Sequence, residues 1–196
     1  LLSLFPGTKV LRMDADTVAA ARGHEALLKQ FTEQNIPILL GTQMVAKGLD
    51  FENVTLVGVL DADLSLYVQN YHAAERTYSL LAQVVGRAGR GERAGRAVIQ
   101  TYHPENEVIQ AAAKQDYEAF YQSELRLRRL RRYPPFADLF TLTVTGLDEL
   151  RVIAAARALC DALRRESGRE PLRALEAEVL GPAGAPVVKI NNRYRY

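Results

Sequence analysis

Residues 36–63, IPILLGTQMVAKGLDFENVTLVGVLDAD, decide the fold, because they hold two apolar runs that each end in polar residues. Continuous apolar runs are typical of strands buried on both faces of a sheet. Segments with helical spacing of apolar residues lie on either side, at 24–33 and at 73–90, the second of which is predicted to be helical until its glycines. Further short strands are predicted within 8–17 and 95–102. Strands that alternate with helices predict an α/β domain whose parallel sheet is covered by helices on both faces.

The chain changes character after residue 115. A long arginine-rich helix is predicted to stop before Pro134-Pro135, because proline disfavours helix in the residue before it. An alternating strand at 138–146 and an amphipathic helix at 147–166 should follow. We therefore predict an α/β domain at 1–115, a connecting helix at 116–133 and a truncated α+β domain at 134–196.

Composition limits the class of protein. The 196 residues are 48% hydrophobic, but no apolar run approaches the ~18 residues needed to span a bilayer. The single cysteine, Cys160, excludes a disulfide within the chain and a cysteine-rich zinc site. With no leader at the start, we expect a reducing cytoplasm. Charge is uneven, −3 over residues 1–120 and +5 over residues 121–196, which favours an anionic partner for the second half.

The loop after the first apolar run carries candidate binding residues. Thr42 comes directly after the strand, at the edge where parallel sheets gather their ligands. Its hydroxyl, the backbone amides of the turn and the charge of Lys47 suit a phosphate of a nucleic-acid backbone. A glycine-punctuated loop with a solvated lysine explains the same residues, and both interpretations stay open.

A second candidate group lies in QVVGRAGR, residues 83–90. Gln83, Arg87 and Arg90 are spaced by four and three residues, which places them on one face of a helix. Arginine presents a rigid fork of donors that suits phosphate. Two such forks are able to hold the terminal phosphate of a nucleotide, but they also suit the free carbonyls of a helix C-terminus.

The two groups together resemble motifs five and six of superfamily-two helicases. The matching patterns are Gly-Thr-(x)4-Lys-Gly-x-Asp-Phe and Gln-x-x-Gly-Arg-x-Gly-Arg. The resemblance implies that residues 1–102 form the distal part of an incomplete RecA-like second lobe. It also implies a set of roles. In the first motif, Thr42, Gln43 and Lys47 would contact DNA, and Gly48 and Asp50 would couple DNA binding to the nucleotide. In the second motif, Gln83 would face ATP, and Arg87 and Arg90 would be arginine fingers.

Further segments resemble the PriA-type family of primosomal replication-restart DNA helicases. They include AAERTYSLLAQVVGRAGR, YPPF and LGPAGAPVVKINNRYRY. This resemblance implies 3′-to-5′ unwinding at stalled or branched forks and primosome assembly in a bacterial, nucleoid-associated setting without a membrane. Implied partners are DNA, single-stranded DNA-binding protein and primosome-loading proteins. ATP with Mg²⁺ would be bound mainly by the missing lobe, because no G-x-x-x-x-G-K-[ST] occurs here. The zinc ions of the intact family have no ligands in this chain.

Two rival functions remain open: another superfamily-two translocase, or a non-enzymatic nucleic-acid-binding module. Either way, we expect this chain alone not to hydrolyse ATP. Two basic segments are further candidates for DNA contacts, ELRLRRLRRY at 124–133 and KINNRYRY at 189–196. The favoured interpretation of the first is a connecting helix with buried leucines and solvated arginines. That of the second is core tyrosines with exposed arginines.

Overall fold

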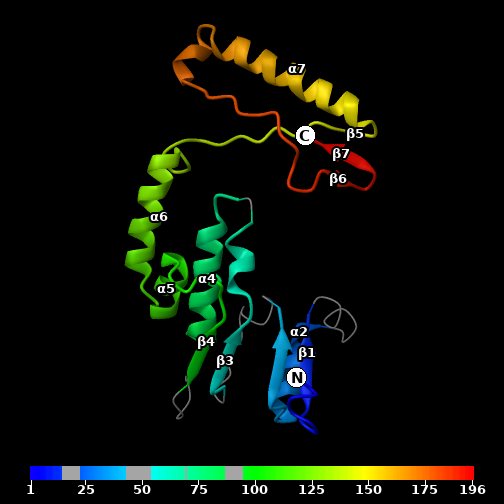
Figure 1. Ribbon diagram of the computed structural model, residues 1–196, viewed down its shortest axis with the longest axis vertical. Helices are drawn as coiled ribbons and strands as arrows, with labels where there is room; N and C mark the ends of the chain where they lie inside the picture. The colour runs from blue at the N-terminus through cyan, green and yellow to red at the C-terminus, as the bar shows by residue number, and fades with distance from the viewer. Residues whose placement is uncertain (15–22, 43–53, 69, 87–94) are drawn as a thin grey trace. The chain divides into compact units, whose positions relative to one another are not determined.

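The computed structural model describes residues 1–14, 23–42, 54–68, 70–86 and 95–196. The chain divides into two compact units, Leu1–Arg132 and Tyr133–Tyr196. Figure 1 shows the helices and strands of both units. No helix in the described ranges has both the length and the apolar character needed to cross a bilayer.

The first unit contains two pairs of parallel strands. Strand β1 (Val10–Met13) pairs with β2 (Ile38–Gly41), and helix α2 (His24–Glu33) lies between them in the chain. Strand β3 (Leu56–Val59) pairs with β4 (Arg96–Ile99), with Leu56 opposite Arg96. Parallel pairing needs a crossover connection, which the intervening helices supply. The predicted α/β class with parallel strands is confirmed.

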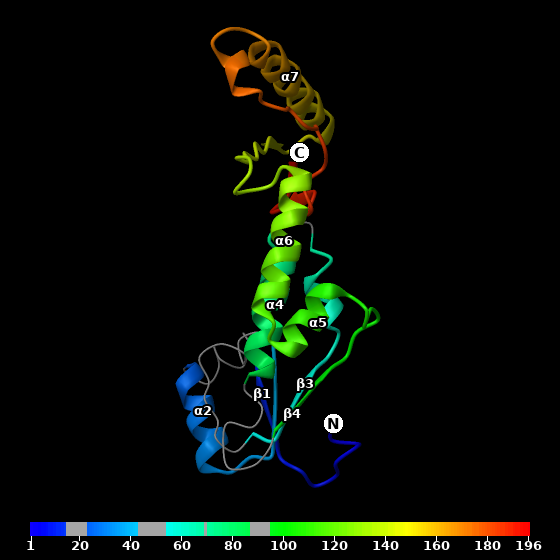
Figure 2. The same cartoon turned by 90° about the vertical axis from the view of Figure 1, so that its left-hand side faces the viewer.

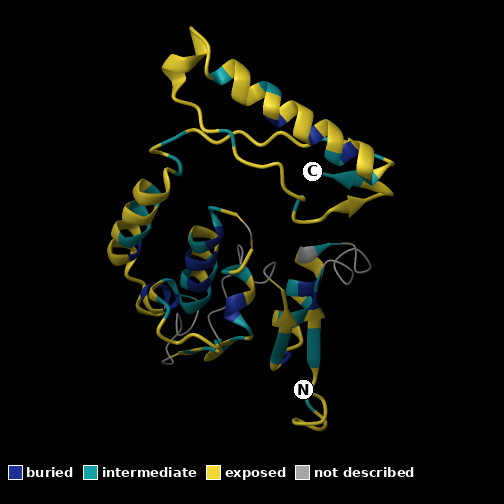
Figure 3. Cartoon of the chain, turned by 45° about the horizontal axis from the view of Figure 1, so that its top comes forward, coloured by how far each residue is buried: buried dark blue, intermediate teal, exposed yellow. Residues whose placement is uncertain are grey.

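The expectation of strands buried on both faces is wrong for the described residues. In the described part of the first unit, the strands form two separate two-stranded sheets. Leu40 in β2 is 42% exposed and Leu56 in β3 is 62% exposed. Along β3 and β4 exposed residues alternate with half-buried ones, as happens when one face of a sheet is covered (Figure 3). Helix α4 (Ala73–Val85) makes that contact with β3 and β4.

Three helices form the main core of the first unit. Helix α4 packs against α5 (Glu107–Lys114) and α6 (Tyr117–Arg131), as Figures 1 and 2 show. Leu81 and Ala112 are almost completely buried between them. The rings of Tyr78 and Phe120 stack with centroids 4.3 Å apart and planes 11° apart. These apolar contacts hold α4 in place, together with Val59 of β3 and Ile99 of β4, which pack against the same cluster.

Local signals set the helix boundaries. The Asn106 side chain accepts hydrogen bonds from the amides of Val108 and Ile109 at the start of α5, and Asp116 caps α6 through the amide of Ala119. At its other end α6 stops at Arg131, and Arg132 adopts a left-handed conformation with φ 53°. The predicted stop before the two prolines is confirmed.

The second unit combines one long helix with a small antiparallel sheet. Helix α7 (Glu149–Ser167) confirms the predicted amphipathic helix and buries Cys160. A short 3-10 helix, η2, is formed by Leu172–Leu175. The strands are β5 (Thr145–Gly146), β6 (Lys189–Ile190) and β7 (Arg193–Arg195), in the order β5-β7-β6.

The strand predicted at 138–146 is wrong over most of its length. Only Thr145 and Gly146 are in a strand, extended by reciprocal backbone hydrogen bonds between Val144 and Tyr196. Phe140, in the part that is not strand, is 90% exposed. An alternating pattern forms a strand only where another strand accepts its hydrogen bonds, and among the described residues 138–143 pair with none.

Candidate nucleotide and DNA site

Thr42 lies where the sequence places it, directly after β2 at the carboxyl end of the strand. It is exposed, as is the preceding Gly41. The other residues predicted for this group, Gln43, Lys47, Gly48 and Asp50, lie outside the described residues. The predicted DNA contacts of this loop therefore stay predictions.

Gln83 lies in the last turn of α4, and its side chain is exposed. Its Nε2 donates a hydrogen bond to Ser79 Oγ at 3.1 Å, one turn earlier on the same helix. Helix α4 ends at Val85, and the Gly86 amide donates to the carbonyl of Ala82. Arg87 and Arg90 lie outside the described residues. Of the predicted group of three side chains, the structure thus places Gln83 alone.

The end of α4 is held firmly. Leu81 is 1% exposed, and the buried Thr77 hydroxyl donates to the carbonyl of Ala73 at 2.8 Å. A Cβ built on Gly86 would lie 2.9 Å from Gln115 Nε2 and 3.2 Å from the Ala82 carbonyl oxygen. A side chain at the first glycine of the G-R-x-G-R pattern would therefore require the flexible Gln115 side chain to shift and would crowd the last turn of α4.

A charged network fastens α6 to α4. The Arg128 guanidinium donates to Glu124 at 2.8 Å and to Glu75 at 2.9 Å, and its side chain is only 13% exposed. Hydrogen bonds from His72 and Arg128 lower the pKa of Glu75 below its usual value. Burial alone would lower the pKa of Arg128, but hydrogen bonds to the two carboxylates raise it. Arg128 is therefore used inside the unit and is not a solvated arginine.

Asp63 joins the ends of β3 and β4. It lies in a short 3-10 helix, η1 (Ala62–Ser65), and accepts hydrogen bonds from Thr101 Oγ1 and from the Tyr102 amide, both at 2.9 Å. Burial acts to raise the pKa of Asp63, but these hydrogen bonds dominate and lower it. The carboxylate thus holds two loops together. No group of three possible metal ligands occurs among the residues that the structure describes.

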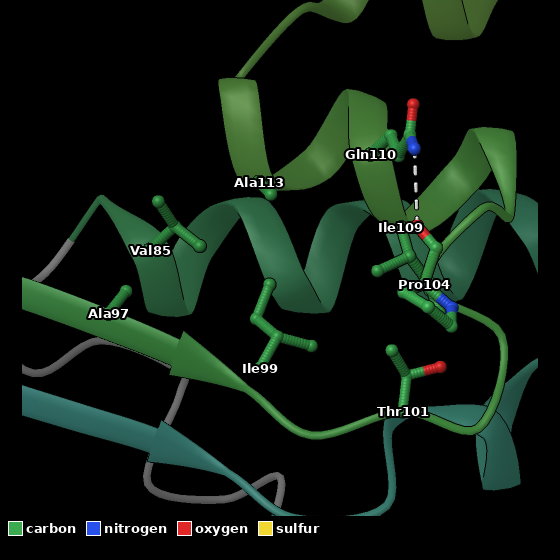
Figure 4. Close-up of a pocket in the computed structure, with 8 residues that line it drawn as sticks. All are labelled: Val85, Ala97, Ile99, Thr101, Pro104, Ile109, Gln110 and Ala113. Atoms are coloured by element: carbon green, nitrogen blue, oxygen red, sulfur yellow. Dashed lines mark hydrogen bonds between the residues drawn. The ribbon is translucent and has the colours of Figure 1, made fainter.

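A pocket of about 280 Å³ adjoins the end of α4 (Figure 4). It is lined by apolar residues of α4, β4 and α5 together with Thr101 and Gln110, namely Val85, Ala97, Ile99, Thr101, Pro104, Ile109, Gln110 and Ala113. The Gln110 amide donates to the Pro104 carbonyl at 3.2 Å. With no charged side chain in its lining, this pocket does not suit a phosphate group.

The tyrosines of the second basic segment make internal contacts. Lys189 Nζ lies 4.5 Å from the centre of the Tyr194 ring, and the Tyr196 hydroxyl donates to Glu149 at 2.8 Å. That hydrogen bond raises the pKa of Tyr196. Both rings are half-buried, whereas Arg193 is exposed. The favoured interpretation of core tyrosines with exposed arginines is only partly right, because the tyrosines make internal contacts but are half-buried, and Arg195 is half-buried as well.

The comparison with family models finds two matches. Residues 1–92 match the model described as "Helicase conserved C-terminal domain", and residues 129–196 match the one described as "Primosomal protein N C-terminal domain". The first match contains every residue of the candidate site. The second begins inside α6 and covers the whole second unit.

Curated relatives align with nearly the full chain. The chain is 44% identical over 196 residues to "Replication restart protein PriA" of Bacillus subtilis, covering 100% of this chain and 24% of that protein. It is 42% identical to the protein of that name from Synechocystis, covering 98% of this chain and 22% of that protein. For Rickettsia felis the identity is 35%, over 99% of this chain and 28% of the relative. The chain thus spans about a quarter of the length of these relatives.

Proposed function

Because the chain belongs to the PriA family of replication restart proteins, we propose that it is part of an ATP-dependent 3′-to-5′ DNA helicase. Residues 1–115 are the distal part of a RecA-like second lobe that is incomplete here, and residues 134–196 are part of the C-terminal domain. The observation that carries this proposal is the order of the two family matches, with both helicase motifs inside the first.

In this proposal Gln83, Arg87 and Arg90 face a nucleotide that is bound mainly by the other lobe. Their side chains are suitable, because an amide and two guanidinium groups can donate several hydrogen bonds to phosphate oxygens. The role of Arg87 and Arg90 is to stabilise negative charge that develops on the terminal phosphate. ATP supplies the phosphoanhydride bond whose hydrolysis drives movement along DNA.

In this proposal, the metal ions are bound by other parts of the intact protein. We assign ATP and its Mg²⁺ mainly to the other lobe, because the phosphate-binding pattern G-x-x-x-x-G-K-[ST] does not occur in this chain. The chain has one cysteine, and Cys160 is buried with its Sγ 3.4 Å from the Gly181 carbonyl oxygen. We therefore assign the zinc of the intact family to segments outside this chain.

DNA contacts are assigned to the loop after β2. Thr42, Gln43 and Lys47 would bind the backbone of the translocating strand without reading its sequence. Gly48 and Asp50, in the same loop, would couple this grip to the nucleotide. In the intact protein the activity serves restart at stalled or branched forks, with single-stranded DNA-binding protein and primosome-loading proteins as partners.

The test is strand displacement by the intact protein on two partial duplexes that differ only in the polarity of their single-stranded tail. We expect ATP-dependent unwinding of the substrate with a 3′ tail and little unwinding of the one with a 5′ tail. A preference for the 5′ tail would refute the assigned direction. DNA binding without ATP-dependent unwinding of either substrate would support the non-enzymatic binding module instead.

A further inference from the structure

The half of α6 that precedes the second unit is fastened by Arg128. Phe120 is buried near the start of the helix, whereas between residues 126 and 132 every residue except Arg128 is exposed. Leu127 and Leu130 are among the exposed residues, so the prediction of buried leucines is wrong for these two. Phe120 and Arg128 therefore hold α6 at two points that are roughly 12 Å apart along the helix axis.

Both points of α6 are attached to α4. The ring of Phe120 stacks on that of Tyr78. Arg128 Nη2 donates to Glu75 Oε2, in the first turn of α4, at 2.9 Å. The same guanidinium donates through Nε to Glu124 of its own helix. Of these contacts the one between Arg128 and Glu75 joins the two helices through a charged pair, and we name it the helix bridge.

Two points of attachment restrict the angle between two helices as well as their distance. Burial of apolar groups is non-directional, so the stacked rings alone would let α4 turn about that contact. A hydrogen-bonded ion pair accepts only a narrow range of distances and angles. The helix bridge therefore contributes to the direction in which α4 points.

The helix bridge adds little to stability. The Glu75 side chain is half exposed, and ion pairs in contact with water contribute little because the solvent screens them. An apolar side chain at position 128 could pack equally well, since it carries no charge to be desolvated. The charged pair thus supplies geometry more than stability.

The far end of α4 is the start of the second helicase motif, residues 83–90. Gln83 lies in the last turn of the helix, and Gly86 is followed in the chain by Arg87. A change of direction at the first turn of a helix displaces its last turn, because the hydrogen-bonded backbone between them is stiff. The direction of α4 therefore decides where the second motif begins.

We propose that Arg128 and Glu75 are positioning residues for the second motif. By holding the first turn of α4 against α6, the helix bridge places Gln83 and the arginines that follow it for contact with the terminal phosphate of ATP. The inference rests on the proposed function, and it adds two residues outside both helicase motifs on which hydrolysis depends.

The test measures DNA-stimulated ATP hydrolysis by the intact protein and by the variants Glu75→Ala, Arg128→Ala and the combination of both. Misplacement of a reacting group by about 1 Å can cost about 10²-fold in rate, so we expect kcat to fall by about tenfold or more in each single variant. KM for ATP should change by less than about twofold, because the arginines act on charge that develops in the transition state. The combined variant should lose no more than the weaker single variant, since all three lose the same contact. An unchanged kcat or additive losses overturn the proposal.

A matched control removes the other partner of Arg128. Glu124→Ala deletes a carboxylate as enclosed as Arg128 itself, but it leaves the helix bridge in place. Its loss of kcat should be well below that of Glu75→Ala, and equal losses would assign the effect to α6 alone and overturn the proposal. Glu75→Gln keeps an oxygen that accepts from Arg128, so it should recover most of the kcat lost in Glu75→Ala. No recovery overturns the proposal.

Hydrogen exchange of the intact protein without nucleotide gives a readout that does not depend on hydrolysis. Glu75→Ala should speed exchange of the amides at 80–86, at the far end of α4, by about threefold or more, and Glu124→Ala should not. A purely local loss would affect the first turn of α4 alone, and unchanged exchange at 80–86 overturns the proposal. The two hypotheses fail separately. An intact protein without DNA-stimulated hydrolysis would refute the proposed function, while faster exchange at 80–86 in its Glu75→Ala variant would still support the helix bridge.

Discussion

Replacing Arg87 with alanine in the intact protein is expected to lower DNA-stimulated ATP hydrolysis by about 10³-fold or more. An arginine that stabilises charge on a transferring phosphoryl group contributes roughly 10³–10⁵ to the rate. DNA affinity without nucleotide should remain close to normal, because the loss is assigned to nucleotide chemistry. Steady-state phosphate release and DNA binding, measured on the same preparation, separate the two quantities.

Two further variants sharpen the Arg87 experiment. Arg87→Lys keeps the charge but loses the planar fork, so we expect it to restore little of the rate. Arg76→Ala, at an exposed position on α4, is the matched control and should hydrolyse ATP normally. The reverse pattern, with hydrolysis kept and DNA binding lost on removing Arg87, would assign this arginine to nucleic acid and favour a binding module.

The second large effect concerns stability. Leu81→Ala should lower the free energy of unfolding of the first unit by about 2–5 kcal/mol, because it leaves a cavity at the centre of the α4–α5–α6 core. Urea unfolding of the chain, followed by circular dichroism, measures the change. Leu130→Ala is the control. As its side chain is 81% exposed, its effect should stay within about 0.5 kcal/mol. Equal effects of the two substitutions would contradict the packing described for α4.

Helices were predictable because their signals are local. The spacing of apolar residues predicted α2 at 24–33, and the structure has it at those residues. The two prolines after Tyr133 predicted the end of α6 in the same way. Strands depend on partners that lie far away in the sequence, so the alternating pattern at 138–146 overstated β5.

The Arg128 network shows what sequence reasoning missed. Its partner Glu75 is 53 residues away, and only the spacing of Glu124 and Arg128 by four residues gave a local sign of pairing. Without that contact, five arginines in one segment looked equivalent. The structure separates one that anchors the helix from four that are exposed.

The candidate site was predicted from two sequence motifs and not from composition. Thr42 and Gln83 were found because they belong to two spaced patterns in the right order, and both prove to be exposed. In the proposed function, the contacts of Arg87 and Arg90 depend on a nucleotide and on the other lobe, so a pattern within this chain does not fix their geometry. Their roles stay predictions.

The most direct measurement is ATP turnover by this 196-residue chain alone, with and without single-stranded DNA, beside the intact protein. A lobe that only supplies arginines to a nucleotide bound elsewhere should show no turnover above background in either condition, while DNA stimulates the intact protein. Sustained DNA-stimulated turnover by the purified chain, which persists in a preparation free of contaminating ATPase, would contradict the account.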